Sequence, residues 1–205
     1  MSGYPVVLEG AAIEALIVGG GAVAERKARA LLDAEARVRV VAPVIAPVLH
    51  ELAARVSPRL SLLERSYAPA DIGHATLVVA ATNDREVNAL VAADARRAGR
   101  LVNVADDPAA GNCMTVAAHR SGPLVIGVTA GVPTAAAYIR AAIAERFDGR
   151  YADALSALAA LRARLLAAGD RDAWRRAVDA LVGDDFCSRV EAAPERYAEE
   201  VAAWR

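Results

Sequence analysis

The chain has 205 residues, and its 24 basic and 25 acidic side chains give a formal net charge of −1. This balance excludes attachment to nucleic acid or to a membrane surface through bulk charge, so we expect neither as a partner. The composition, with 56% hydrophobic and 4% aromatic residues, predicts a helix-rich globular protein. The N-terminus lacks the basic start and long apolar core of a secretory signal, so we expect the protein in the cytoplasm.

The first predicted element is a buried strand over residues 13–18, which runs into three glycines. Residues 19–24 are G-G-G-A-V-A, a G-x-G-x-x-A pattern at the start of a helix predicted over residues 22–34. A turn without Cβ atoms lets a pyrophosphate approach the backbone at a helix N-terminus. Because strand, turn and helix follow in this order, the pattern favours nucleotide binding over a plain turn.

Two cations, Arg26 and Lys27, follow near the start of this helix. Cations there oppose the helix dipole at a cost of up to about 1 kcal/mol, which a bound anion would reverse. The residues alone fit two solvated surface side chains equally well. Lys27 is also the single lysine of the chain, beside 23 arginines. A lysine offers a compact point charge instead of the planar guanidinium of arginine. One residue does not distinguish a requirement for lysine from chance.

Four more strands alternate with helices along the next 80 or so residues. Typical NAD sites carry an acidic residue after the second strand, and this chain has none after residues 37–42. No arginine follows this strand until Arg55, so a clamp for a 2′-phosphate is not evident either, and NAD is favoured over NADP. The alternation predicts a parallel sheet covered on both faces, in a Rossmann-type domain over residues 1–112. The other predicted elements are helices over 46–55 and 85–98 and strands over 60–64, 76–81 and 101–104.

Polar side chains follow the fourth and fifth strands, at the sheet edge where ligands bind in doubly wound folds. Thr82 and Asn83 follow the fourth strand and Asn103 lies in the fifth, so we expect all three near the cofactor. Asp106 comes next, and a carboxylate there can act as a general base or stabilise developing positive charge. On spacing alone, the Asp-Asp-Pro sequence favours a turn in which aspartate caps backbone amides.

The pattern changes after the fifth strand. Two further strands are predicted over residues 113–118 and 124–129, and a helix over 133–147. The uncharged run over residues 121–139 approaches the length of a membrane span, but its prolines and glycines favour a strand, a loop and a helix start. Because this run is too apolar to remain solvated, we expect a twofold homodimer formed by a dimerisation segment over residues 113–148.

Residues 149–205 are predicted to form a helical C-terminal domain. A leucine stripe ends at Gly169, a suitable C-cap, and Asp170 is predicted to cap the next helix. Cys113 and Cys187 are predicted to be free thiols instead of a disulfide or a zinc site, and no metal site is predicted. The apolar stripes of the three helices contain Leu155, Leu158, Leu161 and Leu165, then Trp174, Val178 and Leu181, and last Tyr197, Val201 and Trp204.

Residues 18–27, V-G-G-G-A-V-A-E-R-K, resemble the opening signature of the precorrin-2 dehydrogenase family. That family comprises standalone dehydrogenases, bifunctional dehydrogenase/ferrochelatases and the N-terminal half of siroheme synthase. The similarity covers residues 4–150. Further matches are Tyr4-Pro5, Val41-Ala42-Pro43, Arg65 with Tyr67, residues 80–84 with Asn88, and residues 102–108.

The resemblance implies a homodimeric enzyme that oxidises precorrin-2 to sirohydrochlorin with NAD, in siroheme or cobalamin biosynthesis. The family's catalytic aspartate falls on Asp106. The substrate bears many carboxylates, so the net positive middle of the chain, with Arg120, Arg140 and Thr129, is expected to receive it. The family's nucleotide contacts fall on Gly19, Gly20, Gly21, Ala22, Val23, Pro43 and Val44.

Several alternatives and departures accompany this resemblance. Residues 129–133 are T-A-G-V-P where the family has a serine-rich loop, and Ala130 replaces a regulatory phosphoserine, so that control is not expected. A bifunctional enzyme that also inserts Fe²⁺ stays open, since a lone histidine such as His119 is more often structural than a ligand. An NAD-sensing module without catalysis does not explain Asp106. Short-chain dehydrogenase chemistry is disfavoured because no lysine stands four residues after Tyr138.

Overall fold

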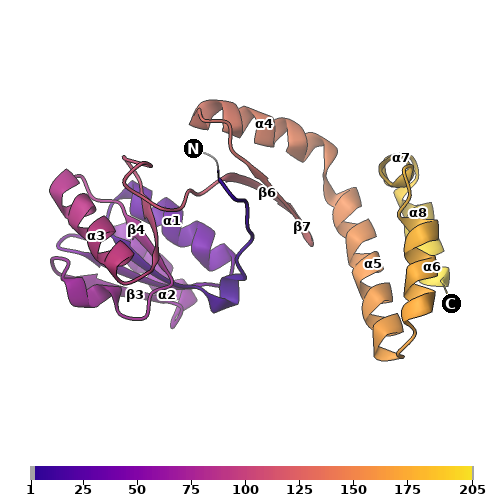
Figure 1. Ribbon diagram of the computed structural model, residues 1–205, viewed down its shortest axis with the longest axis horizontal. Helices are drawn as coiled ribbons and strands as arrows, with labels where there is room; N and C mark the ends of the chain where they lie inside the picture. Colours follow the sequence, from indigo (N-terminus) through magenta and orange to yellow (C-terminus); the bar gives the residue numbers. More distant parts are fainter. Residues whose placement is uncertain (1–2, 205) are drawn as a thin grey trace. The chain divides into compact units, whose positions relative to one another are not determined.

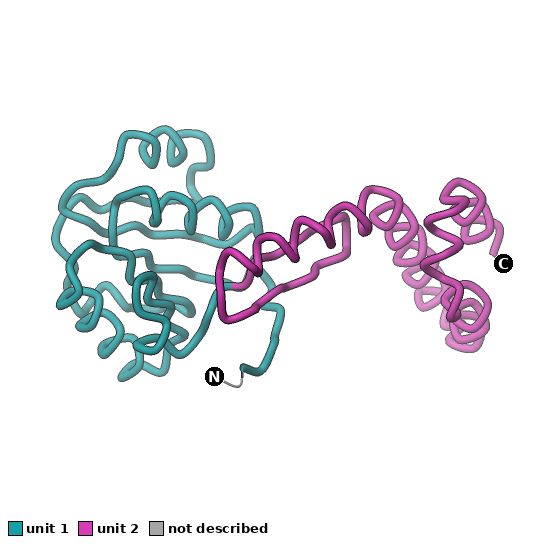
Figure 2. Tube along the Cα trace, turned by 90° about the horizontal axis from the view of Figure 1, so that it is seen from above, with its two compact units in different colours: residues 1–115 teal, residues 116–205 magenta. Residues whose placement is uncertain are grey.

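The computed structural model describes residues 3–204 and divides into two compact units, one that ends at Thr115 and one that starts at Val116 (Figure 2). Each unit has a hydrophobic core of its own. In the first unit, aliphatic clusters cover both faces of a sheet, and in the second a cluster with several aromatic rings joins the helices.

The first unit contains a five-stranded parallel sheet with the order β3-β2-β1-β4-β5. Figure 1 shows this sheet with helices packed around it. This confirms the predicted Rossmann-type sheet. The order reverses between the neighbours β1 and β4, and in such sheets the ligand crevice lies at the carboxyl ends of the two strands flanking the reversal. The strands are β1 (Glu14–Val18), β2 (Arg37–Ala42), β3 (Leu60–Glu64), β4 (Leu77–Ala80) and β5 (Leu101–Val104).

Helices cover both faces of this sheet, as the alternating sequence pattern predicts. The helices α1 (Ala22–Asp33) and α2 (Pro47–Val56) pack on one face, against side chains such as Ile17 and Val79. The helix α3 (Arg85–Arg97) and the 3₁₀ turn η2 (Pro69–Ile72) pack on the other face. A second 3₁₀ turn, η1 (Gly10–Ala12), precedes β1. Successive strand residues alternate between the two faces, so β1, β2, β4 and β5 are mostly buried on both sides, whereas the edge strand β3 is only partly buried.

Two residues that match the family signature hold the loop after β3 in place. The Arg65 guanidinium donates to both carboxylate oxygens of the buried Asp71, at 2.8 and 2.5 Å. The Tyr67 hydroxyl donates to Asp94 at 3.0 Å, and burial together with this carboxylate raises the pKa of Tyr67 well above its ordinary value. Both side chains therefore have structural partners in the first unit.

The second unit begins with an antiparallel hairpin of β6 (Ala117–Ser121) and β7 (Leu124–Val128). The predicted strand over residues 113–118 is wrong at its start. The amide of Cys113 donates to the Val102 carbonyl at 3.2 Å and its carbonyl accepts from the Asn103 side chain at 3.3 Å, so these groups pair with β5 of the first unit and the strand begins only at Ala117. The helix α4 (Pro133–Arg146) packs on the hairpin.

The C-terminal helices enclose the core of the second unit. Asp170 caps α6 by accepting from the Ala173 amide at 2.8 Å, and Gly169 has a φ of +76°, which confirms both predicted end signals. Tyr151, Phe186 and Tyr197 form a chain of aromatic contacts within this core, with ring centroids 6.2 and 5.6 Å apart. The helices are α5 (Gly149–Ala167), α6 (Arg171–Leu181), α7 (Phe186–Ala192), which was not predicted, and α8 (Pro194–Ala203).

The uncharged run over residues 121–139 forms the end of β6, the strand β7 and the start of α4, as predicted. Over residues 3–204, no helix is at once long enough and apolar enough to span a membrane. Both cysteines are free thiols, also as predicted.

Candidate cofactor and catalytic site

The glycine turn joins β1 to α1 at the point where the strand order reverses. Gly19 has a φ of +129°, and a Cβ there would lie 2.2 Å from the Ala81 carbonyl oxygen. A Cβ on Gly20 would lie 2.1 Å from the Val44 carbonyl oxygen. Protein packing therefore requires the first two glycines. A Cβ on Gly21 would meet no heavy atom within 4 Å, so the third glycine keeps open the space at the start of the helix.

Gly21 is also the N-cap of α1, and no side chain caps this helix. The first amides of a helix lack partners within the helix, and together with the positive end of the helix dipole they attract an anion. The amides of Ala22 and Val23 belong to this first turn. The turn thus presents open space and free donors together, as a bound pyrophosphate requires.

The loop after β2 lies against the glycine turn. The Ala46 amide donates to the Gly20 carbonyl at 2.9 Å, and the Val44 carbonyl faces Gly20. Pro43 is exposed, and 79% of Val44 is exposed although it is apolar. The structure therefore brings Pro43 and Val44 beside the glycines, as the family resemblance implies.

The loop after β4 flanks the other side of the strand reversal. Thr82 is half-buried and Asn83 is exposed. The Asp84 carboxylate caps α3 by accepting from the Glu86 and Val87 amides at 2.9 and 3.2 Å. The Thr82 hydroxyl lies 2.8 Å from Oδ1 of Asn88, a buried side chain one turn into α3.

Asp106 follows β5 and borders a small cavity of about 190 Å³. Its Oδ1 accepts from the Asn88 amide at 3.1 Å, and its Oδ2 lies 3.9 Å from Nε of the exposed Arg85. The side chain of Asp106 is 40% exposed, and within the described residues its hydrogen bond to Asn88 involves Oδ1 alone. The cavity is lined by Arg85, Asn88, Ala89, Val104, Asp106, Asp107 and Ala110.

The neighbouring Asp107 has a different role. Its Oδ1 accepts from the Ala109 and Ala110 amides at 3.1 and 3.3 Å, so it caps the turn that follows β5. The Asp-Asp-Pro turn predicted from spacing is therefore present, and Asp107 is the aspartate that caps it. Asp106 is left for contacts outside the turn.

Lys27 and Asn103 meet on the face of the sheet covered by α1. The Lys27 amine donates to Oδ1 of the buried Asn103 at 3.0 Å and to the Thr115 hydroxyl at 2.5 Å. Partial burial lowers the pKa of Lys27, and the charge of Arg26 lowers it further. Lys27 is thus not a solvated surface side chain, whereas Arg26 is exposed. Both polar atoms of the Asn103 carboxamide have protein partners, so its predicted cofactor contact stays a prediction.

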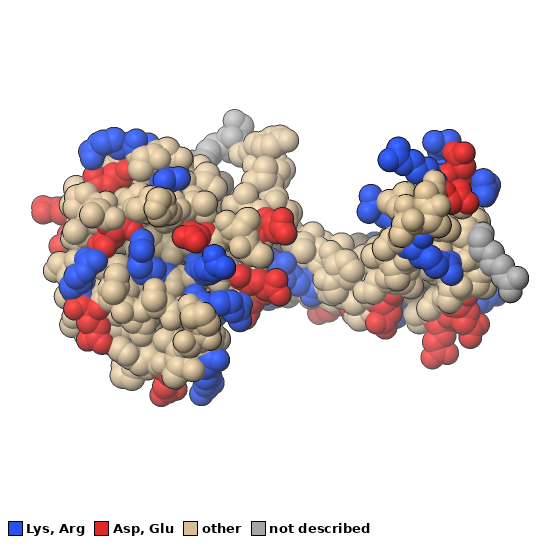
Figure 3. All heavy atoms as spheres, turned by 90° about the horizontal axis from the view of Figure 1, so that it is seen from below, with Lys and Arg blue, Asp and Glu red and all other residues tan. Residues whose placement is uncertain are grey.

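The three residues predicted to bind substrate lie in the second unit. Arg120 is exposed on β6, Arg140 is half-buried on α4, and Thr129 is exposed just after β7. Neither arginine forms an ion pair with any residue in the described part of the chain. The other two arginines of this positive segment are paired, Arg146 with Glu191 at 2.8 Å and Arg150 with Asp148 at 2.9 Å. On the face shown in Figure 3, acidic and basic side chains are interspersed over each unit.

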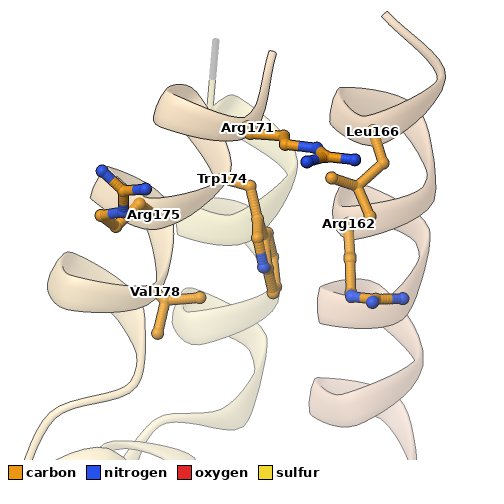
Figure 4. Close-up of a pocket in the computed structure, with 6 residues that line it drawn as sticks. All are labelled: Arg162, Leu166, Arg171, Trp174, Arg175 and Val178. Atoms are coloured by element: carbon orange, nitrogen blue, oxygen red, sulfur yellow. The ribbon is translucent and has the colours of Figure 1, made fainter. Parts of the chain in front are cut away.

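A wider groove of about 560 Å³ lies between α5 and α6 of the second unit (Figure 4). Trp174 projects from α6 toward α5, whereas Arg175 points away from α5. The lining residues are apolar or cationic, so the groove offers no proton acceptor for chemistry, and no residue predicted for the site lines it. The Nε2 atom of His119 lies 2.6 Å from the Phe147 carbonyl oxygen. Within residues 3–204, no three His, Cys, Asp or Glu side chains are grouped so that they could hold a metal ion.

Comparisons with known proteins add to this geometry. Residues 6–117 match a family model described as putative NAD(P)-binding. The siroheme synthase of Chromobacterium violaceum is 44% identical over 153 residues, which is 74% of this chain and 32% of that protein. Siroheme synthase 1 of Aeromonas salmonicida is 37% identical over 205 residues, covering 92% of this chain and 42% of that protein. The chain therefore spans less than half the length of these relatives.

A solved structure named SirC, precorrin-2 dehydrogenase, has the same fold. It superposes with a TM-score of 0.73 over 97% of this chain and 98% of that one, at 21% sequence identity.

Proposed function

Since this chain belongs to the putative NAD(P)-binding family, which bears out the predicted nicotinamide cofactor, we propose that it oxidises precorrin-2 to sirohydrochlorin with NAD⁺. The observation that carries the proposal is the accessible carboxylate of Asp106 at the carboxyl edge of a sheet whose glycine turn can hold a dinucleotide. The names of the similar proteins, siroheme synthase and precorrin-2 dehydrogenase, support this choice of substrate.

The residues of the first unit fit the cofactor. Gly21 leaves the space that a pyrophosphate needs, and the amides of Ala22 and Val23 would donate to it. The proposed cofactor contacts are completed by residues at the same strand ends, namely Pro43, Val44, Thr82, Asn83 and Asn103. NAD⁺, when bound, would supply the hydride acceptor. We assign these roles from the position of each residue in the fold.

The oxidation removes a hydride and a proton from the macrocycle. In our proposal the accessible Oδ2 of Asp106 takes the proton or stabilises the positive charge that develops on the ring. The other oxygen, Oδ1, is fixed by Asn88 and so holds the carboxylate in one orientation. Asp107 supports the turn and takes no part in the chemistry.

The substrate and the assembly are part of the same proposal. Arg120 and Arg140 have no ion-pair partner in the part of the chain that the structure describes, so they are free to receive substrate carboxylates, with Thr129 as a further donor. The dimerisation segment over residues 113–148 exposes large apolar side chains, including 76% of Tyr138 and 46% of Ile139. Such surface favours a homodimer, which we place in the cytoplasm.

An absorbance assay with freshly made precorrin-2 and NAD⁺ tests the proposal directly. We expect formation of NADH and sirohydrochlorin by the wild type. Asp106→Asn should lower turnover by about 100-fold or more, because the amide is nearly isosteric but cannot accept the proton. Asp107→Asn is the matched control and should reduce stability more than rate. A wild type without turnover, or an Asp107→Asn variant that alone is inactive, would show the assignment to be wrong.

A further inference from the structure

Asn88 connects two parts of the candidate site from within the protein. It lies on α3 and only 2% of it is exposed. Its Oδ1 accepts from the Thr82 amide at 3.1 Å and from the Thr82 hydroxyl at 2.8 Å. Its Nδ2 donates to the Thr82 carbonyl at 3.1 Å and to Oδ1 of Asp106 at 3.1 Å. Every polar atom of this carboxamide is therefore engaged with the loops after β4 and β5.

The network fixes which end of the carboxamide faces Asp106. The Thr82 backbone amide can only donate, so it must meet the oxygen of Asn88. The nitrogen of Asn88 then points to Asp106 and donates to its carboxylate. A hydrogen bond to the charged form of a carboxyl group favours ionisation, which is the state that a proton acceptor needs.

The other charged groups around Asp106 make weaker contacts with it. Arg85, on the same helix as Asn88, lies 3.9 Å from Oδ2, and its side chain is 91% exposed, so solvent screens this pair. Asp107 points its carboxylate at the amides of its own turn. Within residues 3–204, Asn88 is thus the one side chain in direct hydrogen-bond contact with the carboxylate of Asp106.

We propose that Asn88 is a positioning residue, which holds the carboxylate of Asp106 in one orientation and couples it to the Thr82 loop at the cofactor site. The proposal rests on the proposed function, in which Asp106 acts on the substrate and Thr82 contacts the cofactor. A shift of the Thr82 loop when the cofactor binds would be transmitted through a single rigid carboxamide to the proton acceptor. Asn88 itself touches neither substrate nor cofactor in this scheme.

Two variants separate the donor from the rest of the side chain. Asn88→Asp keeps the acceptor for Thr82 but places an oxygen where the donor was, and two carboxylates in such contact cannot both ionise readily. Asn88→Leu removes every hydrogen bond. At saturating NAD⁺ we expect both variants to lower kcat by about 10- to 100-fold at neutral pH. We also expect the acid limb of kcat against pH to move to higher pH, further in Asn88→Asp than in Asn88→Leu.

Asn112→Leu is the matched control. The Asn112 carboxamide also bridges two backbone groups beside β5, accepting from the Val102 amide at 2.7 Å and donating to the Arg100 carbonyl at 2.9 Å, and none of these is Asp106. Its loss should lower the melting temperature and leave the pH profile unchanged. If Asn88→Asp and Asn88→Leu have the wild-type pH profile, Asn88 is merely structural and the proposal is overturned.

A second readout does not depend on turnover. In a ¹⁵N-correlated NMR spectrum, the side-chain NH₂ resonances of Asn88 should move as Asp106 titrates in the wild type and stay constant in Asp106→Asn. Constant resonances in the wild type would overturn the proposal. A wild type inactive with precorrin-2 but with titrating Asn88 resonances would instead reject the proposed function while retaining the contact between the two residues.

Discussion

Replacement of Gly21 by leucine should abolish cofactor binding without unfolding the protein. Gly21 has φ −95° and ψ −166°, an extended conformation open to any residue, and an ideal Cβ there meets no heavy atom within 4 Å. A side chain at this position therefore has room in the protein alone. It would occupy the space over the first turn of α1, where the pyrophosphate is expected.

The structure sets the size of both effects. A glycine replaced at a compatible position gains roughly 0.4–1 kcal/mol from the stiffer unfolded chain, and the N-cap loses about as much, so stability should change by less than about 1 kcal/mol. For the cofactor, a Kd raised about 100-fold or more corresponds to at least about 2.8 kcal/mol. Gly20→Ala is the contrasting variant. Its Cβ would lie 2.1 Å from the Val44 carbonyl oxygen and 2.9 Å from the Ile45 Cα, so we expect it to cost about 1–3 kcal/mol in stability.

Isothermal titration calorimetry with NAD⁺ and thermal melts of both variants provide the test. We expect Gly21→Leu to melt near the wild type and to show no measurable heat of binding, and Gly20→Ala to melt earlier. A Gly21→Leu protein that binds NAD⁺ within a few-fold of the wild-type affinity would refute the assignment of this turn.

Three further predictions concern protonation, stability and assembly. In protein labelled with [¹³C]lysine, the single side-chain signal of Lys27 should titrate below the ordinary lysine value of 10.5, because partial burial and Arg26 both disfavour the ammonium; a midpoint at or above 10.5 would contradict this. The Arg65 hydrogen bonds lower the pKa of Asp71, so the stabilising contribution of this carboxylate is complete at neutral pH and is lost as the pH falls below 3.8. The Asp71→Asn variant should therefore unfold at a lower urea concentration than the wild type at pH 7, and the difference should be smaller at pH 3. Light scattering at micromolar concentration should show a dimer, and Tyr138→Glu, which puts a charge on the exposed face of α4, should shift the population toward monomers.

The parallel sheet could be predicted from sequence because its strands are short, apolar and interrupted by glycine or proline. The strands over residues 37–42, 60–64 and 101–104 were predicted with the bounds that the structure shows. Residues 113–116 were misassigned because an apolar run does not indicate its partner, and here Cys113 bonds to β5 while the strand begins only at Ala117. The helix α7 (Phe186–Ala192) has only seven residues, too few for a clear helical period.

The candidate site was predictable only in part, for a related reason. Glycine patterns and aspartates after strands are local signals, and they identified the turn at Gly21 and the edge that carries Asp106. The contacts of Asn88 join residues 6 and 18 positions apart, and those of Lys27 join residues 76 and 88 positions apart. No periodicity specifies such pairs, because they depend on how α1 and α3 lie against the strand ends. Asn88 was noted only as a match to the family signature.

The two adjacent aspartates after β5 show why spacing alone favoured a capping turn there over a carboxylate that takes part in chemistry. An aspartate that caps backbone amides cannot also serve as a proton acceptor without releasing them, so a single aspartate in this turn would have to exchange one role for the other. Here Asp107 satisfies the Ala109 and Ala110 amides and thereby fixes the loop. Asp106 accepts from Asn88 on Oδ1 and borders the cavity of about 190 Å³. The capping turn and the carboxylate that we propose for the chemistry are therefore complementary, since the first fixes the loop on which the second lies.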